Sequence, residues 1–241
     1  MQDLRIFVIS LADDNPRRGQ IGARLTELGL RFELFDAVDG RRGLSDADAA
    51  EIDRVASVKI AQRQLLDGEF AAALSHRRVY ERFLASDAQW ALVFEDDAIL
   101  DDRLVRFVES GGYRAAPLLL LHHLNARVLG EGENVAGCES KAFELAVSPF
   151  RAAAYSLNRS VATKLVAAQT PVRNIADWPL DISQVGARAL VPEIVGHPVV
   201  NEANSALEAS RIKERVRSFW DLVNLAYIRR KWRKLRAKKV S

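Results

Sequence analysis

The chain has 241 residues, 49% of them hydrophobic and 28% charged, and is therefore long enough to bury one full core with or without a small appendage. It contains no stretch of about 18 consecutive apolar residues, the length of a membrane-spanning helix, and its single cysteine, Cys138, excludes an internal disulfide. The first apolar run, residues 6–12, is too short and follows an acid too closely for a secretory signal, so we predict a reducing, cytoplasmic setting.

The net charge of +3 is unevenly distributed along the chain. Residues 211–241 contain 12 lysines and arginines and 2 acids, so this segment carries +10 and the other 210 residues carry −7. The basic character thus belongs to the last part of the chain. We predict one main domain over residues 1–205, followed by a basic, amphipathic helical tail over residues 206–241.

The N-terminal part of the chain predicts a strand, a helix and a second strand. The first strand covers residues 4–11, and Asn15 and Pro16 are typical of the N-cap and the first position of a helix, which ends at Gly29. Residues 32–38 form the second strand. Such a unit is expected to be parallel and right-handed.

Strands and helices continue to alternate beyond this unit. We expect short helices within 44–66, a helix at 69–85, a strand at 90–97, a helix ending near 108, a strand at 117–122, a hairpin or loop at 125–148, a strand at 152–157, a helix at 158–169, a loop at 170–179, a helix at 181–187 and a strand at 190–195. This alternation is typical of an α/β sandwich with a mostly parallel central sheet and flanking helices. Such sheets bind ligands at the carboxyl ends of their strands.

The strand predicted at 90–97 runs from five apolar residues into three adjacent carboxylates, Glu95, Asp96 and Asp97. Carboxylates this close repel one another, and a divalent cation that prefers oxygen ligands, Mg²⁺ or Mn²⁺, relieves the repulsion. Because side chains alternate along a strand, Glu95 and Asp97 are expected to point the same way and Asp96 the other way. We predict Asp97 and Glu95 as metal ligands; an acidic helix cap is the alternative.

Three stretches of the chain form a pattern together. They are Val8-Ile9-Ser10-Leu11 with Arg17-Arg18 and Phe35 to Gly40, Ala73-Leu74-Ser75-His76 with Leu92 to Asp97, and Ala154-Tyr155-Ser156-Leu157 with Asp177 to Asp181. Over residues 4–200 this arrangement resembles glycosyltransferase family 25, which contains the bacterial lipooligosaccharide galactosyltransferases and their collagen-modifying relatives. The pairing of Ser-His with Glu-Asp-Asp carries most of the specificity.

The resemblance implies a GT-A-like, Rossmann-type fold, a UDP-sugar donor, a Mn²⁺ or Mg²⁺ ion and inversion at the sugar carbon. The activity it implies is transfer of a hexose, in this family commonly galactose, to a lipooligosaccharide or another lipid-linked or glycan acceptor. The chain departs from the family pattern at Ala71-Ala72, where a further glycine is expected, and in the acids near Asp177 and Asp181.

His197 follows a predicted strand and is a candidate third metal ligand, because GT-A enzymes often add a late histidine; a loop histidine beside a proline is the alternative. His122 and His123, at the end of another predicted strand, have the same two possible roles. The sequence also predicts residues that bind the donor, with Arg17 placed to reach its diphosphate. These donor-binding residues are Ser10, Leu11, Arg17, Asp39, Ser75, His76 and Asp96. A buried structural histidine is the alternative for His76.

Inversion needs a base that takes the proton of the acceptor hydroxyl group. Asp181 and Asp177 are the candidates, because they flank Trp178-Pro179 late in the chain, where GT-A acceptor sites form. Trp178 is predicted to bind the acceptor by stacking on the apolar face of a sugar ring. A helix N-cap is the alternative role for Asp181.

The basic cluster at residues 229–234 predicts peripheral binding to an anionic membrane surface, at the inner membrane, with packing on the body as the alternative. No nucleic-acid partner is expected. Two other functions stay open: a two-metal nucleotidyl or phosphoryl transferase, which also places acids at strand ends, and a catalytically silent, membrane-associated binding module.

Overall fold

The computed structural model describes residues 3–198 and 232–240. Its strands are β1 (Leu4–Ser10), β2 (Glu33–Asp36), β3 (Trp90–Glu95), β4 (Leu118–Leu120), β5 (Ala126–Asn134), β6 (Lys141–Leu145), β7 (Ala154–Asn158), β8 (Ala187–Val191) and β9 (Lys238–Val240). Its helices are α1 (Asn15–Glu27), α2 (Asp46–Ala50), α3 (Arg54–Ala61), α4 (Asp67–Leu84), α5 (Arg103–Glu109) and α6 (Arg159–Ala168), with 3-10 turns η1 (Gly112–Arg114) and η2 (Ile182–Val185).

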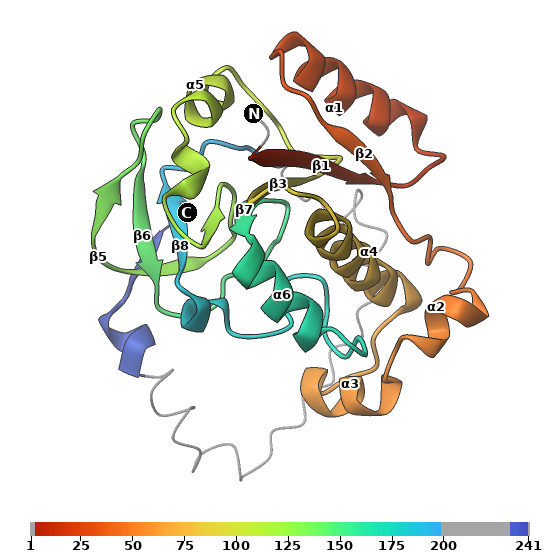
Figure 1. The fold of residues 1–241 in the computed structure, drawn as a ribbon. Helices are drawn as coiled ribbons and strands as arrows, with labels where there is room; N and C mark the ends of the chain where they lie inside the picture. Colours follow the sequence, from red (N-terminus) through yellow and green to blue (C-terminus); the bar gives the residue numbers. More distant parts are fainter. Residues whose placement is uncertain (1–2, 199–231, 241) are drawn as a thin grey trace.

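The described strands form one sheet in the order β2-β1-β3-β7-β4-β8-β6-β5-β9 (Figure 1). This sheet is mixed, so the expectation of a mostly parallel sheet is wrong. β1 is parallel to both β2 and β3, and β4 is parallel to β8, but the other neighbouring strands are antiparallel. β1, β2 and β3 follow the predicted parallel pairing, whereas β7 enters antiparallel between β3 and β4, and the hairpin of β5 and β6 adds further antiparallel pairs.

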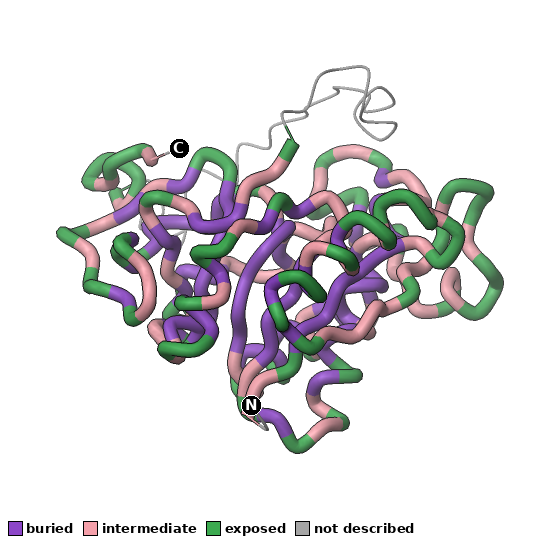
Figure 2. Tube along the Cα trace, turned by 90° about the horizontal axis from the view of Figure 1, so that it is seen from above, coloured by how far each residue is buried: buried purple, intermediate pink, exposed green. Residues whose placement is uncertain are grey.

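The helices cover the two faces of the sheet, and the side chains of β1 alternate between them. Ile6 and Val8 pack in one core with residues of α1 and α5, whereas Phe7 and Ile9 pack in a second core with residues of α4 and α6. α4 and α6 lie together on one side of the sheet (Figure 1), and buried residues concentrate along the central strands (Figure 2). With both faces covered, ligands can approach at the strand ends.

Several predicted boundaries shift in the structure. The segment 125–148 forms the hairpin of β5 and β6, and the helix expected at 181–187 is the short turn η2, which ends at Gly186 in the left-handed region (φ 77°). The strand expected at 190–195 is β8, which starts earlier and ends at Val191. Pro192 follows it directly and has no N–H group to continue the ladder.

The C-terminal residues add a strand to the sheet. Residues 232–236 are helical, and β9 pairs antiparallel with β5, so the expectation of a purely helical tail is wrong for its last residues. The guanidinium group of Arg233 donates a hydrogen bond of 2.7 Å to the carboxylate of Glu144 in β6, which holds this segment against the sheet. The rest of the predicted tail, residues 206–231, lies outside the described residues. Within the described ranges, no helix combines the length and apolar character of a membrane span.

Arg159, the first residue of α6, holds the connection between α4 and β3. Its guanidinium group donates hydrogen bonds to the carbonyl groups of Leu84 (2.8 Å), Ser86 (2.7 Å) and Ala88 (3.1 Å). Leu84 is the last residue of α4, where free carbonyl groups attract a cation. This contact fixes the end of the helix relative to the strand that follows it.

We predict that Arg159→Met lowers the free energy of unfolding by about 2 kcal/mol, because three carbonyl groups lose a charged donor. Chemical denaturation of the parent and the variant measures the difference. Lys164→Met, on the exposed side of the same helix, is the matched control and should change stability by less than about 0.5 kcal/mol. Equal stability of the parent and Arg159→Met would contradict this role.

Candidate functional site

The acids predicted to hold a metal lie at the carboxyl ends of β1 and β3. These strands are parallel neighbours, so Ser10 at the end of β1 and Glu95 at the end of β3 reach the same edge of the sheet. β3 ends at Glu95, and Asp96 and Asp97 occupy the turn that follows. The three carboxylates therefore sit where an α/β sheet binds ligands.

Glu95, Asp97 and His197 form a candidate metal centre. One possible ligand atom from each of them lies within 4.8 Å of those of the other two. His197 reaches the acids because two backbone hydrogen bonds of 2.9 Å join Gly196 to Ile99, just beyond Asp97. The structure thus brings together the three residues that the sequence predicts as ligands.

The ring of His197 is oriented as in a metal-binding histidine. Its Nδ1 lies 2.9 Å from the carbonyl oxygen of Pro198, so in the neutral ring Nδ1 carries the proton and Nε2 the lone pair. Nε2 lies 3.2 Å from Oδ1 of Asp97, a buried oxygen that accepts no hydrogen bond of good geometry from the described residues. A cation between these two atoms removes their repulsion, which fits a metal ion.

The pKa values of this pair shift in opposite directions. Burial by itself lowers the pKa of His197, but the neighbouring Asp97 carboxylate and the Pro198 carbonyl group outweigh burial and raise the pKa above its usual value. Burial by itself raises the pKa of Asp97, but His197 and Arg17 outweigh it and lower the pKa. A metal ion at this site therefore competes with a proton for Nε2 of His197.

Asp96 is held by β1 and α1 instead of by His197. One of its oxygens accepts a hydrogen bond from the hydroxyl group of Ser10 (2.6 Å), and the other from the guanidinium group of Arg17 (3.4 Å). Burial outweighs these contacts and raises the pKa of Asp96. The Arg17 side chain is 51% exposed and lies 4.0 Å from Asp97, so it can also contact a bound anion. Three predicted donor-binding residues therefore adjoin the metal centre.

Ser75 and His76 are adjacent on α4 but contact different strands. Nε2 of His76 lies 3.2 Å from Oε1 of Glu95, at the end of β3. The hydroxyl group of Ser75 donates to the carbonyl group of Ala71 (2.7 Å) and accepts from the backbone N–H of Val38 (2.8 Å), beyond β2. His76 thus contacts the candidate metal centre through Glu95, whereas Ser75 ties α4 to the segment after β2.

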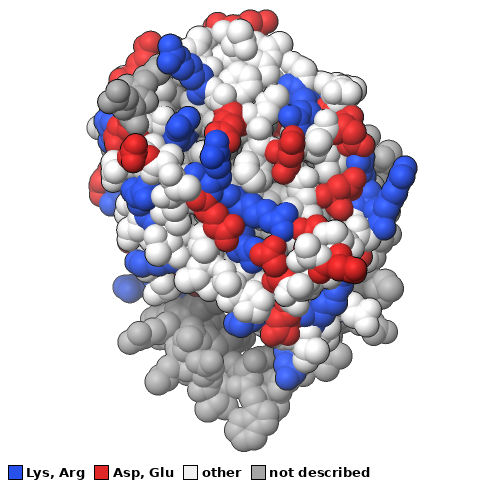
Figure 3. Space-filling model, turned by 45° about the vertical axis from the view of Figure 1, so that its right-hand side comes forward, with Lys and Arg blue, Asp and Glu red and all other residues white. Residues whose placement is uncertain are grey.

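The remaining predicted donor-binding residues, Leu11 and Asp39, lie just beyond β1 and β2. The carbonyl group of Leu11 accepts a hydrogen bond from Arg18 (3.4 Å). Asp39 binds Arg41, which also contacts Asp13, and the hydrogen bonds from Arg41 lower the pKa of Asp39 to about 2. Acidic and basic side chains are interleaved in this way over the face in Figure 3. A donor that binds Asp39 must therefore displace or share Arg41.

The two candidate bases lie on the loop before η2 and at its start. Asp181 caps this turn, because its Oδ1 accepts hydrogen bonds from the backbone N–H of Ser183 and from both the N–H and the hydroxyl group of Ser148. Oδ1 of Asp177 accepts a hydrogen bond from the backbone N–H of Arg151 (3.0 Å). The capping role expected as the alternative for Asp181 is thus present in the structure.

Trp178 is largely buried, with 8% of its surface exposed, and its ring packs edge-on against Tyr155 at 5.4 Å. Little of the indole is available to stack on a sugar. An exposed aromatic ring nearby in the fold is Phe150, which is 60% exposed and precedes Arg151.

Arg151, which the sequence does not single out, lies between Asp177 and the candidate metal centre. Its guanidinium group lies 3.3 Å from Nδ1 of His197, and its backbone adopts a φ of 75°, which is uncommon for a residue other than glycine. Backbone strain of this kind clusters at functional sites. A positive φ at arginine has no signature in the sequence, so prediction could not have found it.

Glu193 is a second residue that sequence analysis did not identify. Its two oxygens lie 2.9 Å from Nδ1 of His122 and 3.1 Å from Nδ1 of His123. The ring of His122 stacks on that of His197, with 5.3 Å between centroids. His122 and Glu193 therefore support the candidate ligand His197. In the sequence, the only indication of this role is that Glu193 lies four residues before His197.

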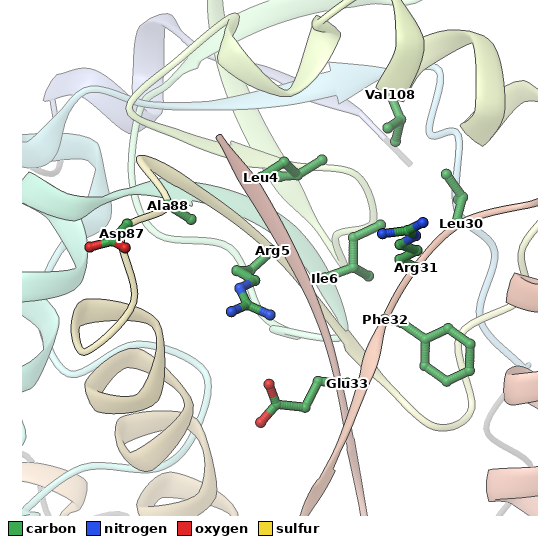
Figure 4. A pocket seen from close by; sticks show the side chains of 10 residues that line it. All are labelled: Leu4, Arg5, Ile6, Leu30, Arg31, Phe32, Glu33, Asp87, Ala88 and Val108. Atoms are coloured by element: carbon green, nitrogen blue, oxygen red, sulfur yellow. The ribbon is translucent and has the colours of Figure 1, made fainter. Parts of the chain in front are cut away.

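A pocket of about 640 Å³ opens at the opposite edge of the sheet (Figure 4). Among its lining residues are Leu4 and Glu33, which begin β1 and β2, and Ala88, which precedes β3. These positions are the amino ends of the parallel strands. The pocket is thus separated from the carboxylates by the length of β1 and β3.

Comparison with known proteins identifies relatives of this chain. The sequence profile of glycosyltransferase family 25 (LPS biosynthesis protein) matches residues 3–183. A probable inactive glycosyltransferase 25 family member 3 from Rattus norvegicus is 30% identical over 171 residues, which are 68% of this chain and 30% of that protein. The lacto-N-neotetraose biosynthesis glycosyltransferase LgtE from Neisseria meningitidis serogroup B is 27% identical over 57% of this chain and 50% of its own length.

A further relative is the lipooligosaccharide biosynthesis protein lic2B from Haemophilus influenzae, which is 28% identical over 42% of this chain and 36% of its own length. The chain thus spans half or less of the length of each of these three relatives. One of them is described as inactive, so the match by itself does not establish catalysis.

Proposed function

Since this chain belongs to glycosyltransferase family 25, we propose that it is a metal-dependent, inverting glycosyltransferase of the GT-A type. It moves a hexose, with galactose the first candidate, from a UDP-sugar to a lipooligosaccharide or another glycan acceptor. The observation that carries this proposal is the group of Glu95, Asp97 and His197 at the carboxyl ends of the parallel strands. The experiment that tests it is UDP release, with and without Mn²⁺, across a panel of sugar nucleotides.

Two carboxylates and one imidazole would hold the metal ion. Carboxylate oxygens suit both Mg²⁺ and Mn²⁺, while the imidazole of His197 favours Mn²⁺. When bound, the ion neutralises charge on the diphosphate leaving group. Arg17, which is half exposed beside Asp96 and Asp97, adds a guanidinium donor for the same phosphates. Leu11 and Asp39, just beyond β1 and β2, supply further donor contacts, while the buried Ser10 and His76 hold Asp96 and Glu95.

We assign the base to Asp177 ahead of Asp181. Asp177 binds the backbone of Arg151, whose guanidinium group lies beside His197, whereas Asp181 caps η2. The Asp177 carboxylate takes the proton of an acceptor hydroxyl group, whose oxygen then bonds to the sugar carbon from the face opposite the UDP. The carbon–oxygen bond to UDP breaks, and its electron pair leaves with the diphosphate. Trp178 shapes this loop, and the exposed ring of Phe150 stacks on the acceptor sugar.

The two alternative functions, a two-metal transferase and a silent binding module, would use the carboxyl ends of the parallel strands differently. A two-metal nucleotidyl or phosphoryl transferase needs ligands for a second ion, and the described residues contain one group of three candidate ligands. A silent binding module would hold UDP without releasing it from a sugar. UDP release from a sugar nucleotide favours the glycosyltransferase, release of a sugar phosphate favours the nucleotidyl transferase, and no release favours the silent module.

We predict that Asp97→Asn nearly abolishes transfer and weakens UDP binding when Mn²⁺ is present but not when it is absent. The change removes a charge from the metal centre while keeping the shape of the side chain. Calorimetric titration with UDP, with and without Mn²⁺, measures the effect. Asp101→Asn is the control, because Asp101 is exposed and paired with Arg103. If Asp97→Asn keeps the Mn²⁺-dependent affinity of the parent, the metal assignment is wrong.

We predict that Asp177→Asn lowers turnover by about 10²-fold or more, because a general base is lost, and changes UDP-sugar affinity by no more than a few-fold. The amide oxygen can still accept the Arg151 hydrogen bond, so the loop should keep its shape. Steady-state kinetics of Asp177→Asn and Asp181→Asn compare the two acids. If Asp181→Asn alone loses turnover at unchanged stability, the base is Asp181, and if neither does, both assignments fail.

The basic tail supports a proposal of peripheral binding to an anionic membrane at its cytoplasmic side. We predict that changing Arg229, Arg230 and Lys231 to Gln weakens binding to anionic vesicles on the order of 100-fold, since each cation contributes about 1 kcal/mol. The effect should shrink as added salt screens the charges. Vesicle cosedimentation measures it. Changing the exposed body residues Arg31, Lys59 and Lys164 to Gln is the control and removes the same charge; equal losses would contradict a specific role of the tail.

A further inference from the structure

A chain of three buried side chains lies behind Glu95. Nε2 of His76 is 3.2 Å from Oε1 of Glu95, Nδ1 of His76 is 2.8 Å from the hydroxyl oxygen of Tyr155, and that oxygen is 2.9 Å from the hydroxyl oxygen of Tyr80. His76, Tyr155 and Tyr80 are each at most 1% exposed. α4 supplies His76 and Tyr80, and β7 supplies Tyr155.

The hydrogen bonds of this chain have one consistent direction. The ionised Glu95 carboxylate can only accept, so Nε2 of His76 carries a proton and donates it. In the neutral ring Nδ1 then accepts from the hydroxyl group of Tyr155, which in turn accepts from Tyr80. Burial raises the pKa of both tyrosines well above the usual value, so both hydroxyl groups keep their protons.

We infer that Tyr80, Tyr155 and His76 are positioning residues that hold Glu95 toward the cation site it shares with Asp97 and His197. This inference rests on the proposed metal centre. Glu95 itself is 33% exposed, and a partly exposed carboxylate loses side-chain freedom when it binds a metal ion. The N–H group of the buried His76 ring already restricts the Glu95 side chain, so less side-chain entropy is lost when the ion binds. Residues that hydrogen-bond to a metal ligand in this way typically change metal affinity 10–100-fold.

A purely structural role makes a different prediction. The rings of His76 and Tyr155 stack at 5.9 Å, and Tyr155 also packs against Trp178, so all of these side chains fill the core between α4 and the sheet. If packing were their whole contribution, removal of one hydroxyl oxygen would alter stability and leave metal affinity unchanged. Metal affinity is therefore the measurement that separates positioning from packing.

The test is calorimetric titration of the full chain with Mn²⁺ alone, without donor or acceptor. Tyr155→Phe removes one oxygen, frees the His76 ring to adopt either tautomer and should weaken Mn²⁺ binding about 10-fold. Tyr113→Phe is the matched control, because Tyr113 is also buried but packs on Trp90 at the start of β3, and it should stay within about twofold of the parent. Equal Mn²⁺ affinity of Tyr155→Phe and the parent overturns the inference.

A second pair of variants tests the donor itself. His76→Gln keeps an N–H group near the position of Nε2, whereas His76→Leu removes it, so Mn²⁺ affinity should fall about 10-fold further in the Leu variant. Equal Mn²⁺ affinities of the two variants overturn the inference. Circular dichroism confirms which variants fold, and Tyr155→Phe remains decisive if the His76 variants do not. Failure of the parent to bind Mn²⁺ overturns the metal centre of the proposed function, and this inference with it.

Discussion

The repulsion among three adjacent carboxylates dominates this part of the molecule. The acid triplet, residues 95–97, follows a buried strand, so each of its charges needs a partner close by. Three different parts of the chain supply one: His76 from α4 for the first acid, Ser10 and Arg17 from β1 and α1 for the second, and His197 from beyond β8 for the third. The triplet is therefore the point at which the elements around the sheet edge meet.

Local features of this fold could be predicted from the sequence, whereas strand pairing could not. The unit of β1, α1 and β2 follows from hydrophobic periodicity, Pro16 and Gly29, and all of these signals lie within the segment they describe. The mixed sheet depends on β7 entering between β3 and β4, and on β9 joining β5. These contacts join residues far apart in the sequence, and no local pattern records them.

The same distinction applies to the site. Glu95, Asp97 and His197 could be chosen because their chemistry is specific, although Asp97 lies in the turn after β3 and not within the strand expected from the sequence. Tyr155 and Arg151 act through contacts that depend on the folded sheet, so their sequence positions carry little information. Trp178 and Asp181 illustrate the limit more sharply. An aromatic ring beside a proline suits either a binding face or a core, and an aspartate before a short turn suits either a base or a cap; burial and hydrogen bonding decide between them.

The contacts of Ser75 and His76 explain why this adjacent pair on α4 occurs together with the acid triplet in the sequence. Adjacent side chains on an α-helix point about 100° apart, so the two cannot act on one atom. α4 packs over β1, and the strands on either side of β1 are β2 and β3. Ser75 accordingly binds the segment after β2, at Val38, and His76 binds the end of β3, at Glu95. A shift of α4 by one residue would break both contacts. The pair thus fixes the helix relative to two strands at once, which places the first acid of the triplet.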